Sequence, residues 1–415
     1  MRSSPLSPAS GAGLRLLVVV LVALAGIVVI DSLPQPAPRP PPPASPPIGP
    51  ARSYDQLLAS RDSALAERRR LAEERPDEWL VQEQFARAAL ARARLTGSYD
   101  DYAAAQQALD QAFAQAPSGA GPHLSQAVLH LTLHRLGPAE QMLDSIARYA
   151  VPPDAGERAE IAAMRGDIAF YRGDYPRALR LYDEADTLEP GTAHFRRAIF
   201  HSKTGRVDLA ERYFALYERT LAAVDRHGRA NVELQRGILD LDNGRHREAL
   251  AHFRVAEALF PGWWLVDEHV AETTALLGDA ADAERRYRDI VRRTGSPEFI
   301  DALGALLRAR GADDEAETLR RQSAALWERR LGQFPEATYG HAIDHCFAFA
   351  RPGCALALAR RNFAARPYGE AGEKLARALA GVGRPAEARV VIERVLASGW
   401  RTREAERIAR MVGPA

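Results

Sequence analysis

The chain has 415 residues, of which 47% are hydrophobic, 26% are charged and 7% are aromatic. Its 55 basic and 54 acidic side chains leave a formal net charge of +1, so no overall positive field recruits nucleic acid. Alternating runs rich in valine, isoleucine and threonine are missing, which favours an all-helical fold. Lys203 and Lys374 are the only lysines, and we attribute the excess of arginine to codon bias in a GC-rich bacterial genome.

The first feature along the chain is an apolar run from Leu14 to Ile30. Only Arg15 interrupts it, and its uncharged part has 15 residues, slightly fewer than the roughly 20 of a full membrane span. Arg2 and Arg15 precede the run, so the positive-inside rule keeps residues 1–13 in the cytoplasm. The pattern therefore predicts a signal-anchor helix over residues 14–32 in the bacterial inner membrane, with the remaining chain on the periplasmic side.

Two alternatives to this anchor stay open. Ala23, Leu24 and Ala25 resemble the small-residue site of a cleaved signal peptide, although cleavage there would leave an apolar stretch on the mature terminus. The other alternative is a buried core helix, which the proline tract behind the run disfavours.

Residues 33–52 form a proline-rich segment that includes the run PAPRPPPPASPPIGP. Such a tract prefers extended polyproline II, so we interpret it as a spacer rather than as a ligand for a proline-binding module. A charged helix is expected over residues 53–76. Its leucines give it one modest apolar face, which suits a helix that caps the domain behind it.

From there on, one alanine recurs at steps of 32 to 39 residues. A period near 34 residues is typical of stacked helical hairpins, and it makes residues 77–400 one elongated domain of about nine hairpins. Three steps of 39 residues, which end at Ala178, Ala249 and Ala355, predict lengthened helices or loops. The recurring positions are Ala105, Ala139, Ala178, Ala210, Ala249, Ala283, Ala316, Ala355 and Ala388.

Other positions keep a fixed distance from this alanine. Twelve residues before it stands a second small residue, such as Gly166 or Gly237, which would allow two helices to pack closely. Five residues before it stands a turn glycine, such as Gly173 or Gly244, which suits the left-handed end of a helix. Four residues after it stands a bulky apolar side chain, which would face the next hairpin.

The segments Gly166–Pro190 and Gly237–Pro261 carry this pattern well and resemble tetratricopeptide repeats. The resemblance implies an all-α, right-handed superhelical solenoid of antiparallel hairpins, with a C-terminal capping helix over residues 401–415. Arg320, Ala359 and Asn362 depart from the pattern, so their units are assigned by period alone.

In this family the first helix of each hairpin lines a concave groove that holds peptide ligands. Transferred to this chain, the resemblance implies a partner groove, whereas the family's carboxylate clamp is absent. Trp263 and Trp264 open the sixth hairpin and could either anchor a partner or pack between repeats. The groove positions are Asp167, Phe170, Tyr171, Asn231, Ile238, Glu268, Glu272, Arg308 and Arg377.

Few residues indicate catalysis. His341, Asp344 and His345 form the segment HAIDH, which resembles the HxxEH of inverted zinc metallopeptidases with Asp in place of Glu. A third ligand is not evident, so a polar helix surface is the favoured interpretation. His130 and His134 have the same spacing, but His134 falls at a turn. We therefore expect no catalytic residues, no metal and no cofactor.

Cys346 and Cys354 bracket the turn of the eighth hairpin, which has Ala350 where glycine is usual. They could form a disulfide if the domain is extracytoplasmic, or remain two small core residues.

Together these features predict a membrane-anchored scaffold that binds protein or peptide partners in the cell envelope. An assembly factor for a multi-subunit envelope complex is the alternative, and a zinc enzyme that uses HAIDH is the less favoured one.

Overall fold

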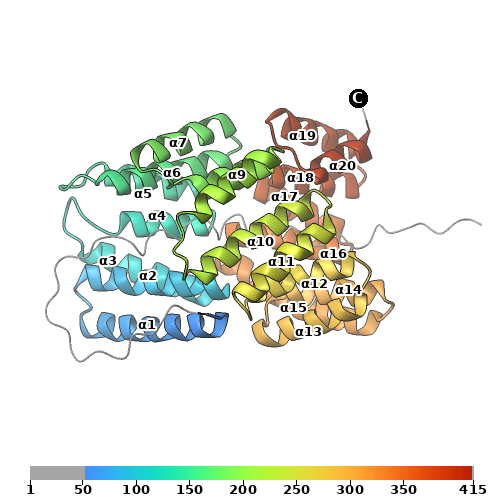
Figure 1. The fold of residues 1–415 in the computed structure, drawn as a ribbon, viewed down its shortest axis with the longest axis horizontal. Coiled ribbons are helices and arrows are strands. Elements are labelled where there is room, and N and C mark those ends of the chain that lie inside the picture. The colour runs from blue at the N-terminus through green and yellow to red at the C-terminus, as the bar shows by residue number, and fades with distance from the viewer. Residues whose placement is uncertain (1–51, 414–415) are drawn as a thin grey trace, which may run out of the picture.

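The computed structural model describes residues 52–413, which form twenty α-helices and no strand (Figure 1). The predicted cytoplasmic terminus (1–13), the signal anchor (14–32) and nearly all of the proline-rich segment (33–52) lie outside the described residues. Within the part that is described, no helix is long and apolar enough to cross a membrane.

Eighteen of the helices form nine antiparallel hairpins, and one helix flanks the array at each end. The predicted all-helical solenoid of hairpins is therefore confirmed. The flanking helices are α1 (Tyr54–Glu74) and α20 (Arg403–Val412). The hairpins are α2 (Trp79–Thr96) with α3 (Tyr99–Gln115), α4 (His123–Thr132) with α5 (Leu136–Ile146), α6 (Ala155–Tyr171) with α7 (Tyr175–Leu188), α8 (His194–Lys203) with α9 (Val207–Glu218), α10 (Arg226–Asp242) with α11 (His246–Leu259), α12 (Trp264–Leu276) with α13 (Ala280–Thr294), α14 (Pro297–Ala309) with α15 (Asp313–Gln333), α16 (Pro335–Ala348) with α17 (Pro352–Ala365), and α18 (Gly369–Gly381) with α19 (Pro385–Ala397).

The recurring alanines sit where two helices of a hairpin approach each other. Each of the nine is at most 2% exposed. The small residue twelve positions earlier faces the bulky residue of the second helix, so a Cβ atom added at Gly237 would overlap the ring of Phe253. Glycine at this position therefore allows an aromatic ring to lie directly against the backbone of the first helix.

Most hairpin turns contain a residue in the left-handed region, as predicted. The φ angle is +76° at Gly173 and +73° at Gly244. Ala350 and His134 occupy the same position in their hairpins and adopt the same conformation, with φ of 53° and 60°. The turn geometry is thus kept even where a Cβ atom makes it unfavourable.

The lengthened elements predicted from the three long steps are also present. Helices α6 and α10 have 17 residues each and α15 has 21, whereas α8 has 10.

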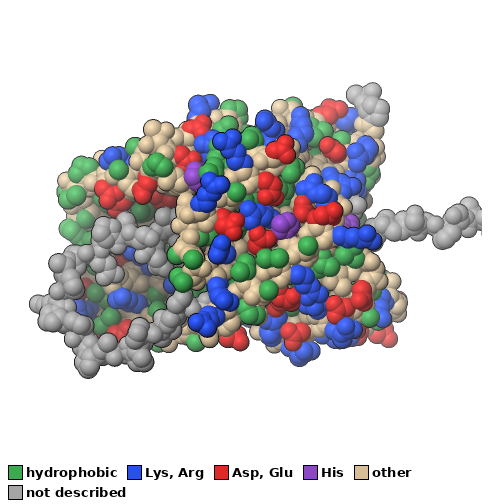
Figure 2. Space-filling model, in the orientation of Figure 1, with side chains coloured by type: hydrophobic (Ala, Val, Ile, Leu, Met, Phe, Trp, Pro, Cys, Tyr) green, Lys and Arg blue, Asp and Glu red, His purple; other side chains and the backbone are tan. Residues whose placement is uncertain are grey.

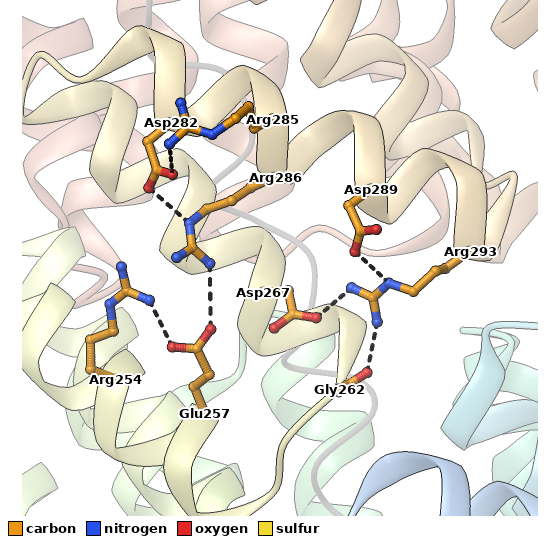
Figure 3. Close-up of polar contacts among 9 residues, drawn as sticks. All are labelled: Arg254, Glu257, Gly262, Asp267, Asp282, Arg285, Arg286, Asp289 and Arg293. Atoms are coloured by element: carbon orange, nitrogen blue, oxygen red, sulfur yellow. Dashed lines mark hydrogen bonds and ion pairs between the residues drawn. The ribbon is translucent and has the colours of Figure 1, made fainter.

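Arginine side chains connect neighbouring hairpins across their outer surface. In Figure 3, Arg286 of α13 bonds Asp282 of its own helix at 2.9 Å and Glu257 of α11 at 3.4 Å. Arg293 bonds Asp289, Asp267 at the start of α12, and the carbonyl oxygen of Gly262. On the face seen in Figure 2, basic and acidic side chains are interspersed, which agrees with the near-zero net charge.

The expectation of an elongated domain is wrong, because the later hairpins pack against the earlier ones (Figure 1). The indole nitrogen of Trp264 donates to the carbonyl oxygen of Leu95 at 3.1 Å, across 169 positions of sequence. The backbone nitrogen of Gly369 donates to the hydroxyl of Tyr175 at 2.8 Å. Between α8 and α20, the backbone nitrogen of Arg401 donates to the carbonyl oxygen of Lys203 at 2.9 Å. These contacts close the solenoid on itself.

Candidate functional site

Closure of the solenoid turns most of the predicted groove positions toward the interior. Phe170 is 3% exposed and packs on Trp400, with ring centroids 6.0 Å apart, while Tyr171 packs on Tyr368 at 5.2 Å. Asp167 accepts hydrogen bonds from Tyr182 and Arg196.

The other predicted groove positions differ among themselves. Asn231, Glu268 and Glu272 are buried, whereas Ile238 is half-buried. Arg308 is exposed and contacts Phe349 and the carbonyl oxygen of Ala348. The nine side chains therefore do not share one open surface.

In place of an open groove, the structure has a polar cavity of about 140 Å³ between the two halves of the array. Its walls come from the carboxyl-terminal parts of α8, α10 and α12, helices α16 and α18, and the start of α20. The ionisable side chains that line the cavity include Lys203, Asp242, Glu272, Asp344, Glu370, Glu373, Lys374 and Arg377. Of the predicted groove positions, Glu272 and Arg377 line this cavity.

Both lysines of the chain face the cavity. The Nζ atom of Lys203 lies 2.6 Å from an Asp242 oxygen. The Nζ atom of Lys374 lies 2.5 Å from an Asp344 oxygen and 3.0 Å from the carbonyl oxygen of Gly340. Burial opposes the charged form of Lys203, but Asp242 outweighs it and the pKa of the lysine is raised. Codon bias, which we proposed for the scarcity of lysine, would not account for this shared location.

The cavity also holds carboxyl groups that no basic partner neutralises. Glu373 accepts a hydrogen bond from the indole nitrogen of Trp400 at 2.8 Å and another from Thr402, both neutral donors. Burial raises its pKa to about 8. Such a pocket suits a ligand that brings positive charge or accepts hydrogen bonds.

Beside the cavity, and sharing Glu272 with its wall, lies a cluster that sequence reasoning missed. Glu268, His269 and Glu272 of α12 are each at most 5% exposed, and each offers one donor atom within 4.8 Å of the others. Burial raises the pKa of Glu268 to about 8 and that of Glu272 well above its ordinary value, while it lowers the pKa of His269 to about 3. The spacing EHxxE on one helical turn is the sequence signal that could have found it.

The HAIDH segment does not form such a cluster among the described residues. His345 bonds Asp301 at 2.9 Å, and the ring of His341 stacks on Trp327 at 6.0 Å. Asp344 accepts from Lys374 instead. The three side chains are therefore directed to three different partners.

The second histidine pair is also separated by its contacts, and both residues of the tryptophan pair are buried. His130 contacts Gln126 at 3.0 Å, whereas His134 packs on Tyr171. Trp263 and Trp264 are 6% and 8% exposed and lie within a core cluster. Both tryptophans thus pack between repeats.

Cys346 and Cys354 are joined in a disulfide, with Cα atoms 5.8 Å apart. The bond connects α16 to α17 across the turn at Ala350.

No protein-family model matches the chain, and no curated protein matches it. Among solved structures, yeast Tom70 is similar over 86% of this chain and 88% of that chain, at 14% identity and a TM-score of 0.42. A thermophilic TPR protein of Thermus thermophilus is similar over 44% of this chain and 98% of its own, at 18% identity and a TM-score of 0.36. A tetratricopeptide repeat protein of Parabacteroides merdae covers 61% of this chain and 98% of its own, at 14% identity and a TM-score of 0.36. Likenesses this distant assign no partner or activity to this chain.

Proposed function

We propose that this chain is a membrane-tethered scaffold that binds protein or peptide partners on the outer side of a bacterial inner membrane. The disulfide between Cys346 and Cys354 carries the proposal, since such bonds persist in oxidising compartments and are rare in the cytosol. The apolar run over residues 14–32 supplies the anchor, and the proline-rich segment supplies the spacer.

We infer the binding role from the array of hairpins, and the face seen in Figure 2 carries charges of both signs. Because the concave side is occupied by the chain's own side chains, we place the partner on the outer surface, with access to the mouth of the polar cavity.

The compartment is tested by counting thiols in the full-length chain as it is extracted from cells under an alkylating quench. We expect no labelled cysteine before reduction and two after it. Cys346→Ser is the matched control, because it frees the thiol of Cys354 and should give one labelled cysteine without reductant. Two labelled thiols in the unreduced wild type would contradict the proposal.

Orientation and partners need separate measurements. A reporter fused to the carboxyl end should be active only outside the cytoplasm, and activity inside would overturn the topology.

Crosslinking in intact membranes, followed by co-purification, should recover a discrete protein partner. Recovery of several subunits of one complex would favour the assembly-factor alternative, and recovery of none would remove the scaffold role.

A further inference from the structure

The cluster on α12 has the composition of a metal site in a chain for which none was expected. We propose that Glu268, His269 and Glu272 bind one divalent transition-metal ion, for which zinc is the probe. One imidazole and two carboxylates are ligands that zinc and its first-row neighbours accept.

The distances within the cluster fit one ion. The Nδ1 atom of His269 lies 3.3 Å from an oxygen of Glu268 and 3.5 Å from an oxygen of Glu272. Ligands that hold zinc at about 2.0–2.2 Å in a tetrahedral arrangement are separated from one another by about 3.3–3.5 Å. The two separations from His269 therefore match, and all three donor atoms lie within 4.8 Å of one another.

Independent of the distances, the donors lack other partners. Both oxygens of Glu268, both ring nitrogens of His269 and one oxygen of Glu272 are buried without a hydrogen bond. Buried polar groups are nearly always satisfied in native proteins, and a concentration of unsatisfied ones calls for a ligand or ion. A cation among these atoms would satisfy several of them at once.

The surroundings favour a fixed site with one open side. The ring of Phe253 stacks on His269 with centroids 5.1 Å apart and an interplanar angle of 13°, which holds the imidazole in place. Tyr287 of α13 lies near the carboxyl group of Glu268 without a hydrogen bond to it. Glu272 lines the polar cavity, so water from the cavity can complete the coordination.

Within residues 52–413, no other group of three histidine, cysteine or carboxylate side chains comes together in this way. His252 bonds Glu233 at 2.7 Å, and its side chain is 33% exposed. The imidazole of His252 is therefore already hydrogen-bonded and in contact with solvent. It is therefore the matched control for adventitious zinc binding at a surface histidine beside a carboxylate.

The experiment uses the full-length chain, stripped with a chelator, reloaded with zinc alone and passed over a desalting column. We expect about one zinc per chain by elemental analysis, and a rise in the thermal midpoint on reloading. His269→Gln and Glu272→Gln should each weaken zinc binding by at least about 100-fold. His252→Gln, and His341→Gln in the HAIDH segment, should bind zinc as the wild type does.

The ligand set is checked on the wild type, so that the test does not depend on variants that fail to fold. X-ray absorption of the zinc-loaded chain should show nitrogen and oxygen ligands, with a single imidazole. Zinc that stays below one per ten chains, two imidazoles in the absorption spectrum, or binding unchanged in folded His269→Gln and Glu272→Gln would each overturn the site. None of these results would bear on the scaffold proposal, which rests on the compartment and the partner.

Discussion

A single methyl group added at Gly237 tests whether the hairpins pack as described. In Gly237→Ala the new Cβ atom would overlap the ring of Phe253, and this ring has no exposed surface into which it could move. Overpacking of a core costs about 1–3 kcal/mol. Alanine regains about 1 kcal/mol of helix propensity. The net expectation is a loss of up to about 2 kcal/mol in the free energy of unfolding.

Gly332 provides the matched control, because it also lies in a helix, α15, but is exposed, with no atom near the position of an added Cβ. Gly332→Ala should therefore stabilise the chain by about 0.5–1 kcal/mol. The two variants make the same chemical change with opposite expected signs.

Urea unfolding of the full-length chain, followed by circular dichroism, measures both variants with the wild type. The midpoints should move in opposite directions, whereas the slopes should stay equal. If Gly237→Ala is stabilised as Gly332→Ala is, so that both variants shift in the same direction, the close contact between α10 and α11 is refuted.

Two further predictions concern buried charge. The side chain of Arg196 is 4% exposed and lies 2.7 Å from Glu160 and 2.9 Å from Asp167, so Arg196→Met should cost about 3–5 kcal/mol in urea unfolding. Arg285→Met removes an arginine whose side chain is 71% exposed, so it should change stability by less than about 0.5 kcal/mol, and equal losses would contradict the buried network. The carboxyl group of Glu373 keeps its proton up to about pH 8 in the folded chain but loses it near pH 4.5 in the unfolded chain. Its contribution to the free energy of unfolding therefore falls as the pH rises between these two values, by up to about 1.4 kcal/mol per pH unit. Glu373→Gln should flatten the wild-type dependence of unfolding free energy on pH between 5 and 8, and an unchanged slope would refute the raised pKa.

The local architecture was predictable because each hairpin is specified within about 34 residues. The alanine at 178, the glycine at 173 and the ring at 182 lie within ten positions, and short-range sterics determine how they pack. Even the exceptions follow this rule, since Ala350 adopts the left-handed conformation that its place in the hairpin requires.

Closure was not predictable in the same way. The curvature of a solenoid is the sum of small rotations between repeats, and the spacing of alanines does not encode their size. The bond from Trp264 to Leu95 joins segments that no periodic pattern relates. Phe170 and Tyr171 stand at groove positions by register, yet only closure explains why they contact Trp400 and Tyr368.

The candidate site was harder still to predict from the sequence, because it forms only when the solenoid closes. Lys203, Asp344 and Glu373 come from three separate hairpins and meet only when the halves of the array pack together. His269 was within reach of sequence analysis through its spacing to Glu272, but a groove assignment treats such residues as exposed. Burial shifts the pKa values of these side chains. Their burial results from the tertiary packing of the hairpins and not from the local sequence.

Closure also constrains where a partner of the proposed scaffold could bind. A peptide lying along the concave side would have to separate Trp264 from Leu95, Tyr175 from Gly369, and the aromatic contacts of Trp400. It would also expose the ion pairs of both lysines. Each broken buried hydrogen bond leaves an unsatisfied group that costs about 1–3 kcal/mol, so the combined penalty would exceed what a short peptide recovers. The outer faces of the hairpins and the mouth of the cavity require no such opening, and partner binding there leaves the closed array intact.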